Sequence, residues 1–259
     1  MKVVFKSLIT AAAFMAAHSA FATIVDIAPG STYKGVKLSG DQTLSLSENA
    51  RAFLDILQPT ITAVDGAVIA VEKPDEFTHV NVSSTGNLSS VAVVDETLET
   101  VSASAIGGLK LTVTPKRGIS SGGWIQISDL KVDLLTKQVL ATVSGANGVG
   151  ALTNYPLWNF STVEGSSVVI PSTPNTTAIT TFKVSGLFLT TDGLSKVATA
   201  LAVGTIGKSA LLSVQDFGAI STTVTATPVA TCAVTFKNST INTSSPLFNT
   251  EVTVSNISS

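Results

Sequence analysis

Apolar and small polar residues alternate along much of the chain. In residues 43–46, 109–113 and 221–225, β-branched residues or leucines alternate with small polar ones. Because successive side chains of a strand point to opposite faces of a sheet, this two-residue period predicts strands with one buried face. The pattern therefore favours an all-β fold, mainly antiparallel and sandwich-like.

Turn residues mark two strand pairs. Asp65-Gly66 separates residues 60–64 from residues 67–71, and this dipeptide readily takes the positive φ angles of a type I′ turn, so we expect a hairpin. Residues 123–144 are predicted to form a second pair with its turn near Thr136 and Lys137. A last strand is expected at residues 248–254.

Two short helices interrupt the strands. The first is predicted after Ser47, which can act as an N-cap, and is expected to end before Pro59. The second begins near Thr191 and Asp192 and ends at Gly204. Each has apolar residues at i, i+3, i+4 and i+7, and each is expected to cover one end of a sheet. These residues are Ala50, Phe53, Leu54 and Leu57 in the first helix, and Leu194, Val197, Ala198 and Leu201 in the second.

The N-terminus predicts export. Lys2 and Lys6 precede an apolar run over residues 8–17, and Ala20-Phe21-Ala22 fits a signal-peptidase site. Residues 1–22 are therefore predicted to be a signal peptide of bacterial type, and no later apolar stretch is long enough for a membrane-spanning helix. The protein is expected in the periplasm, at the cell surface or outside the cell.

Residues 155–175 are rich in Pro, Ser, Thr and Asn and are predicted to form a long loop or a boundary. The exported part, residues 23–259, is expected to be one β-rich region or two sub-domains with a seam near residues 155–175. Cys232 is the one cysteine of the chain, so an intramolecular disulfide is excluded. A thiol buried in a strand is expected, and intermolecular pairing is the alternative.

Composition narrows the classes of partner. The chain is 44% hydrophobic, its mean hydropathy is +0.45, and its formal charge is −2. Such a chain has enough apolar surface for a packed core, which argues against disorder. It has no basic stripe that could displace counterions from phosphates, so no nucleic acid is expected as a partner.

Two stretches resemble catalytic motifs. Residues 118–122 match G-x-S-x-G, but the only histidine after the signal peptide, His79, precedes Ser120, and a strand rather than a helix is predicted next. A turn of small residues is therefore the interpretation. Residues 202–209 miss the phosphate-binding P-loop by one residue and follow a predicted helix, so they are interpreted as a helix-to-strand turn. The protein is not expected to be an enzyme.

No metal site or cofactor is predicted. Acidic residues gather at residues 75–76 and 95–99, but neighbouring carboxylates on a strand point to opposite faces, so a solvated acidic rim is expected. His79 has no second histidine or cysteine beside it and is interpreted as an exposed strand residue. Tyr155, Trp158 and Phe160 are close in sequence and are the candidates for contact with a ligand or partner; the alternative is that they are buried in the core.

Three segments together resemble the strand and L-x-L-T-x-x-G pattern of HtaA-type domains: residues 127–134, 139–145 and 187–193. The stretch that contains them, residues 127–193, is about a quarter of the chain. The resemblance implies a secreted or surface-displayed bacterial β-rich domain, and several members of that family bind haem through a Tyr ligand supported by His. Residues 50–53 contain no Tyr where such a ligand would be sought, and His79 is alone, so no haem ligand is assigned.

The sequence therefore favours an exported, non-enzymatic bacterial protein with a binding or surface-structural role. Strands rich in Thr and Val would also suit self-association through their edges. The alternatives are a carrier of haem or of another small ligand, as in HtaA-type domains, and a secreted hydrolase that uses Ser120.

Overall fold

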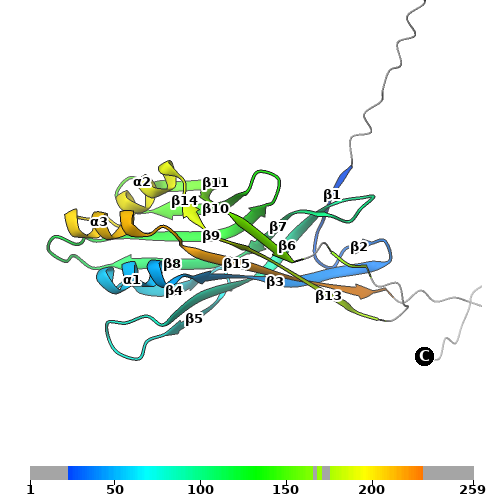
Figure 1. Cartoon of the computed structure of the whole chain (residues 1–259), viewed down its shortest axis with the longest axis horizontal. Coiled ribbons are helices and arrows are strands. Elements are labelled where there is room, and N and C mark those ends of the chain that lie inside the picture. The colour runs from blue at the N-terminus through cyan, green and yellow to red at the C-terminus, as the bar shows by residue number, and fades with distance from the viewer. Residues whose placement is uncertain (1–22, 166–167, 171–175, 230–259) are drawn as a thin grey trace, which may run out of the picture. The chain divides into compact units, whose positions relative to one another are not determined.

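The computed structural model describes residues 23–165, 168–170 and 176–229, which form one antiparallel sheet with three short helices (Figure 1). The predicted all-β, mainly antiparallel class is confirmed. The predictions for the signal peptide, for Cys232 and for a strand at residues 248–254 lie outside the described residues.

Fifteen strands make up the sheet in the described residues. They are β1 Ile24–Ile27, β2 Thr32–Tyr33, β3 Val36–Leu46, β4 Thr60–Val64, β5 Val68–Glu72, β6 Asn81–Val94, β7 Thr100–Ile106, β8 Gly108–Val113, β9 Gly123–Asp133, β10 Gln138–Gly145, β11 Gly150–Asn159, β12 Thr162–Gly165, β13 Ala178–Ser185, β14 Phe188–Leu189 and β15 Gly218–Pro228. The helices are α1 Glu48–Leu57, α2 Thr191–Ala200 and α3 Thr205–Ser213.

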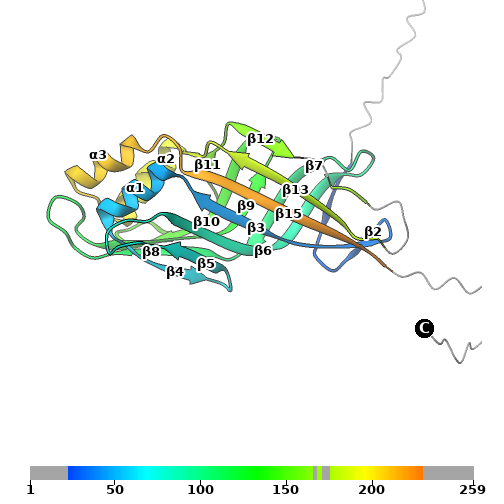
Figure 2. The ribbon, with the colours of Figure 1, turned by 60° about the horizontal axis from the view of Figure 1, so that its bottom comes forward.

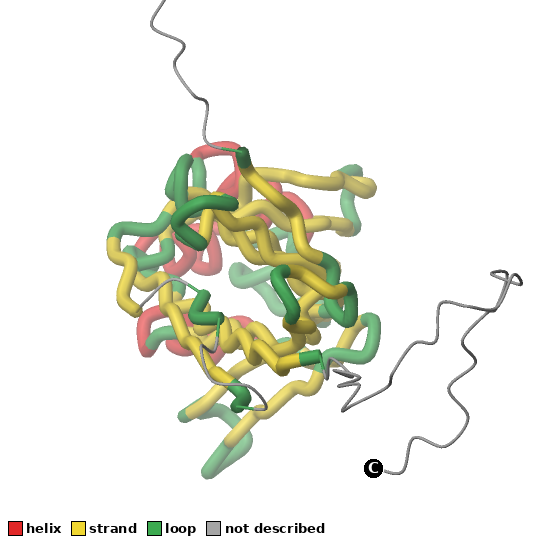
Figure 3. Tube along the Cα trace, turned by 90° about the vertical axis from the view of Figure 1, so that its right-hand side faces the viewer, coloured by secondary structure: helices red, strands yellow, loops and turns green. Residues whose placement is uncertain are grey.

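The sheet curls around its own core. Its main path runs β12-β13-β15-β3-β6-β7-β9-β10-β11-β14, with β1, β2, β4, β5 and β8 attached at the sides. The curl brings β9, β10 and β11 opposite β3, β13 and β15, as the two layers of a sandwich would lie (Figure 2). Seen from the side opposite the helices, the strands enclose the core (Figure 3). One sheet thus supplies both layers.

The two ends of this path meet at a corner. β11 is followed at once by β12, and β13 by β14, while β11 pairs with β14 and β12 pairs with β13. At the bend Gly186 has φ +67°, and a Cβ there would lie 2.1 Å from Oγ of Ser161. Glycine is therefore favoured where the chain leaves β13 for β14.

α1 and α2 confirm the predictions made from apolar spacing. Ser47 caps α1 by accepting a hydrogen bond from the backbone N–H of Ala50 at 3.1 Å, and α1 ends at Leu57, two residues before Pro59. Thr190 caps α2 in the same way, accepting from Gly193 N–H at 3.0 Å. The apolar face of each of these two helices is the buried one, as the apolar spacing predicts.

The third helix was not predicted. Residues 202–209 were interpreted as a turn and Gly204 as a helix end, but Gly204 is the N-cap of α3. The turn interpretation is therefore wrong from Thr205 onward. All three helices lie at the same end of the sheet, beside one another (Figures 1 and 2).

The turn at Asp65-Gly66 is confirmed, but the pairing of its arms is wrong. Asp65 and Gly66 have φ angles of 50° and 78°, and Ala67 N–H donates to the carbonyl of Val64 at 3.1 Å. However, β4 pairs with β8 and β5 pairs with β6, and no β4–β5 ladder forms in the described residues. The strand pair predicted at residues 123–144 is confirmed as β9 and β10.

Residues 155–175 are not one long loop. Residues 155–159 belong to β11, which pairs with β10, and residues 162–165 form β12. Pro156 is tolerated within β11 because it lies at a register shift between β10 and β11. Residues 166–167 and 171–175 lie outside the described residues.

Candidate functional site

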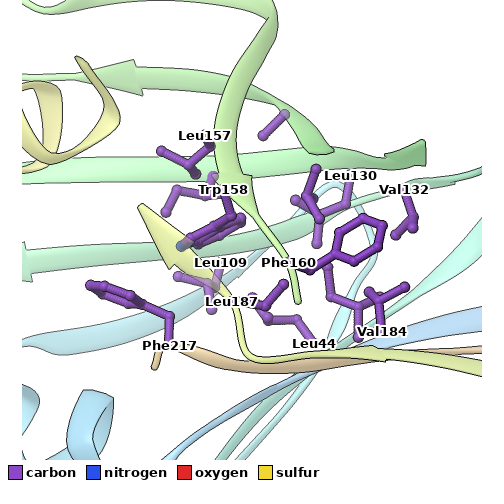
Figure 4. Close-up of a cluster of buried hydrophobic side chains, with 14 of the residues drawn as sticks. Leu44, Leu109, Leu130, Val132, Leu157, Trp158, Phe160, Val184, Leu187 and Phe217 are labelled. Atoms are coloured by element: carbon purple, nitrogen blue, oxygen red, sulfur yellow. The ribbon is translucent and has the colours of Figure 1, made fainter. Parts of the chain in front are cut away.

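A cavity of about 50 Å³ lies between α1, α2 and the inner face of the sheet. Its walls come from both helices, from β3, β8, β9, β11 and β14, and from the segments that follow α2 and precede β15. The lining residues share an apolar character: Leu44, Leu46, Ala50, Phe53, Leu54, Leu109, Leu111, Ile125, Ile127, Trp158, Leu189, Val197, Leu201 and Phe217. Part of this wall, with the core beside it, is drawn in Figure 4.

Two periodicities bring these side chains together. On α1, Ala50, Phe53 and Leu54 are three and four residues apart, so they share one helical face. On β8, Leu109 and Leu111 are two residues apart and so share one face of the sheet. The apolar positions that predicted helix and strands are thus the positions that build the cavity wall.

Trp158 carries the one polar side-chain atom among the lining residues. Its side chain is only 3% exposed, and its Nε1 is buried with no hydrogen-bond partner among the described residues. Figure 4 shows the indole projecting from β11 into the interior, with its nitrogen on the side where Phe217 lies. A buried indole N–H usually has an acceptor. This one is inaccessible, so Trp158 contributes carbon atoms and not its N–H to the cavity surface.

The cavity can bind but has no groups for covalent chemistry. Of the described residues that line it, none carries a carboxylate, imidazole, thiol, amine or hydroxyl. Its volume is well below the roughly 300–1,000 Å³ of sites for drug-sized ligands, so it fits a small or slender apolar molecule. Dry cavities lined by Leu, Ile and Phe do bind such molecules.

The predicted aromatic cluster is divided between two surroundings. Phe160 is 3% exposed and packs in the core beside Val132 and Val184 (Figure 4). Tyr155 is half-buried, and its hydroxyl donates to Oδ2 of Asp192 at 2.7 Å, which joins β11 to the first turn of α2. Burial, and then the hydrogen bond to Asp192, raise the pKa of Tyr155. Of the three aromatics, only Trp158 lines the cavity.

Ser120 is held in a tight turn. Its hydroxyl donates to the carbonyl of Leu201 at 2.6 Å and accepts from Gly122 N–H at 2.9 Å, and the residue is 4% exposed. The predicted turn of small residues fits this arrangement. The hydroxyl joins the turn before β9 to the end of α2, beside a wall residue of the cavity.

The stretch that resembles a P-loop contacts the same turn. Gly204 N–H donates to the carbonyl of Ile119 at 2.7 Å, and Ile206 N–H donates to that of Gly118 at 2.9 Å. A phosphate at this helix N-terminus would need free amides, and these two already have acceptors. The stretch therefore serves to dock α3 against residues 118–119.

His79 is not an exposed strand residue, so that prediction is wrong. It lies between β5 and β6 and is 3% exposed. Its backbone N–H donates to Oδ1 of Asp55 at 2.8 Å, and its ring Nδ1 lies 2.7 Å from the same oxygen. Asp55 is a half-buried residue of α1, so this contact holds the segment before β6 against that helix.

The acidic residues lie at the surface, away from the cavity. Asp75 and Glu76 are exposed, and Asp95 contacts Tyr33 at 2.5 Å and Nζ of Lys34 at 3.1 Å. Hydrogen bonds from Tyr33 and then Lys34 lower the pKa of Asp95. Among the residues that the structure describes, no three His, Cys, Asp or Glu side chains are grouped as metal ligands would be.

An open groove of about 580 Å³ runs between α2 and α3. Its lining mixes apolar and polar side chains, among them Leu194, Ser195, Lys208 and Leu212. Because it is open to solvent and chemically mixed, it defines no ligand as clearly as the cavity does.

Sequence reasoning identified Trp158 but not the cavity. The spacing of Phe53, Leu54, Val197 and Leu201 marked them as buried helix faces, while their convergence on the strands depends on contacts far apart in the chain.

Comparisons with protein-family models, with curated proteins and with solved structures found no match to this chain. Within residues 23–229, as far as they are described, no helix is both long and apolar enough to span a membrane.

Proposed function

We propose that the protein is an exported, non-enzymatic bacterial binding protein that holds a small apolar molecule in the cavity under α1 and α2. The observation that carries the proposal is a cavity of about 50 Å³ whose fourteen lining residues are all aliphatic or aromatic. Export is supported by Lys2, Lys6 and the Ala20-Phe21-Ala22 site.

The proposal agrees with the small-ligand binding that the HtaA-type resemblance implies, but not with haem binding. A macrocycle does not fit into a cavity of this volume. The hydroxyls of Tyr33 and Tyr155 both donate to carboxylates, and Nδ1 of His79 lies beside Asp55. A secreted hydrolase is less well supported, because the Ser120 hydroxyl already donates to a backbone carbonyl.

Filling the cavity tests the proposal. Ala50 is 3% exposed and lines the cavity from α1, whereas Ala52 on the same helix is exposed. With xenon under pressure as the probe, we expect the melting temperature of the mature protein to rise, because a ligand that binds only the folded state stabilises it. The rise should persist in Ala52→Leu and disappear in Ala50→Leu.

The smaller Ala50→Val variant serves if leucine overpacks the site, and it should weaken the xenon effect without abolishing the fold. An unchanged melting temperature of the wild-type protein, up to the highest xenon pressure applied, would reject the proposal. Equal responses in Ala50→Leu and Ala52→Leu would place xenon elsewhere and reject this site.

A second candidate function is self-association through β4 and β5. In the described part of the chain each of these strands pairs on one side only, and their shared turn holds their other edges near each other. Val68 and Val71 on β5 are 69% and 39% exposed. An unpaired strand edge with apolar side chains is a template for a strand of a second copy, which sedimentation velocity would detect.

A further inference from the structure

We infer that residues 248–254 of one copy of this chain insert as a strand between β4 and β5 of a second copy. The inference rests on the second candidate function, self-association, and names the segment that these strand edges bind. β4 pairs with β8 along all five of its residues, and β5 pairs with β6 along all five, so one side of each strand is occupied. In the described part of the chain, the other side of each has no partner strand.

The free sides of β4 and β5 belong to one gap in the sheet. Ala67 N–H donates to the carbonyl of Val64 at 3.1 Å, so the two strands lie beside each other at their shared turn. Beyond the turn they follow different neighbours and form no ladder with each other among the described residues. Alternate residues of an edge strand point their N–H and C=O groups away from the existing partner. A strand placed in this gap can therefore form hydrogen bonds on both of its sides.

The core face of the gap has apolar side chains that remain accessible. Val71 lies opposite Val82, which is fully buried, so both point to the core face of the sheet. Ala63 lies opposite Leu109, which is 3% exposed. Nevertheless, Val71 is 39% exposed, and Ala63 is exposed as well. Apolar residues of an inserted strand would cover these two positions.

The outer face of the gap is mostly small and polar. The exposed residues on this face are Thr60 and Thr62 of β4, and Val68, Ala70 and Glu72 of β5. Because successive side chains of a strand alternate between its two faces, an inserted strand needs apolar residues at every second position. The residues between them need to be polar, since they would face solvent.

Residues 248–254 have this pattern. The side chains that would share the core face are Phe248, Thr250, Val252 and Val254, and three of these four are apolar. Glu251 is among those that would point outward. The segment contains no proline, which could not donate to a ladder. It is also long enough to span β4 and β5, which have five residues each.

A second copy is a better acceptor of this segment than the same copy. Residues 230–247 separate the segment from Val229, the last described residue, and can span at most ~60 Å. To reach the gap of its own copy, this linker would have to pass over β3 and β6, which separate β15 from β5. Where these two strands pair, their outward side chains are polar, among them Asp41, Thr43, Thr85 and Asn87. The crossing would therefore bury little apolar surface.

Adjacent residues of the segment provide matched variants. In Val252→Lys a charge replaces an apolar side chain that the gap would bury, whereas Glu251→Lys changes a residue that is already charged and would point outward. By sedimentation velocity of the mature protein, we expect association to be at least about ten-fold weaker in Val252→Lys, because a buried charge without a partner is costly. Glu251→Lys should change the association constant by less than about two-fold.

Mixing two defective variants tests which surfaces meet. Val71→Lys places a charge on the core face of the gap and leaves residues 248–254 unchanged, while Val252→Lys leaves the gap unchanged. We expect each variant to be monomeric where the wild type associates, and an equimolar mixture to form a dimer and nothing larger, since only one intact interface remains. If Val71→Lys does not fold, Val68→Lys replaces it, because Val68 is 69% exposed on the same strand.

The outcomes separate the insertion from self-association itself. Association as strong in Val252→Lys as in the wild type, or a mixture that stays monomeric, would overturn the insertion and leave edge pairing of β4 and β5 in place. A monomeric wild type whose melting temperature falls in Val252→Lys, but not in Glu251→Lys, would place the segment in its own copy. That result would overturn both the inference and the second candidate function.

Discussion

Tyr155 shows how a single hydrogen bond connects the helices to the sheet. Its hydroxyl lies 2.7 Å from Oδ2 of Asp192, and burial together with this bond raises its pKa above the ordinary value near 10. A group whose folded-state pKa is raised stabilises the protein fully below its unfolded pKa, and the contribution is lost as the pH rises toward the folded pKa. The relevant window therefore begins at about pH 10.

We expect Tyr155→Phe to lower the free energy of unfolding by about 1 kcal/mol at neutral pH and to flatten its decrease above about pH 10. Urea denaturation at several pH values would measure both effects. Tyr33→Phe is the comparison, because Tyr33 also has a raised pKa but contacts Asp95 far from α2. A Tyr155→Phe curve parallel to that of the wild type above pH 10 would contradict the prediction.

At this scale, sequence reasoning failed where a partner is distant in the chain. His79 was expected to be exposed because it has no second histidine or cysteine beside it, yet Asp55, 24 residues earlier, accepts its backbone N–H. Ser120 was correctly placed in a turn because Gly118 and Gly122 flank it. The cavity role of Trp158 depends on the helices packed over it, which no local pattern encodes.

Gly207 sets the distance between α3 and the turn before β9. A Cβ at Gly207 would lie 2.3 Å from the carbonyl oxygen of Ile119, a backbone atom that cannot rotate away. Replacing a glycine inside a helix with alanine normally stabilises the helix by about 1 kcal/mol. Here the contact should reverse that sign, because the whole helix would have to shift.

We expect Gly207→Ala to destabilise the protein by about 1–3 kcal/mol, measured by urea denaturation. Ser209→Ala, at an exposed position of the same helix, should change the free energy of unfolding by less than about 0.5 kcal/mol. A Gly207→Ala protein more stable than the wild type would show that helix propensity outweighs the contact.

The elements differ in how far their own sequence determines them. α1 and α2 were predictable because four apolar residues in each follow the helical repeat. α3 buries only Gly207 and Leu211, and its position depends on residues 118–119. Asp65-Gly66 determined its turn but not the partners of β4 and β5, which β8 and β6 provide.

At the scale of the whole molecule, the sides of β4 and β5 that have no partner strand among the described residues predict self-association. We expect the mature protein to sediment faster as its concentration increases, and Val68→Lys to remove this dependence, because a charge on an edge strand disfavours pairing with another chain. Leu212→Lys is the control. Leu212 is 57% exposed, comparable to Val68 at 69%, but lies on α3, which has no sheet edge.

The control also separates two surfaces. Loss of association in Leu212→Lys but not in Val68→Lys would assign the contact to the groove between α2 and α3, which Leu212 lines, and would reject the strand-edge model. A wild-type protein that remains monomeric at all concentrations would reject self-association altogether.

The fold class followed from the alternation of apolar and polar residues, but the strand order did not. Alternation indicates which face of a strand is buried, but it does not determine which strands pair with it. The neighbours here are set by pairs such as Leu46 with Gly218, which no turn connects.

That pairing has a consequence for the order of events in folding. β3 and β15 pair along eleven positions, from Val36 with Pro228 to Leu46 with Gly218. During synthesis from the N-terminus, the sheet cannot be completed until residue 228 has been made. Until then, the edge of β3 that pairs with β15 has no partner strand. Such non-local closure makes refolding slow, on the order of milliseconds to seconds or longer, and leaves that edge of β3 unpaired until β15 is available.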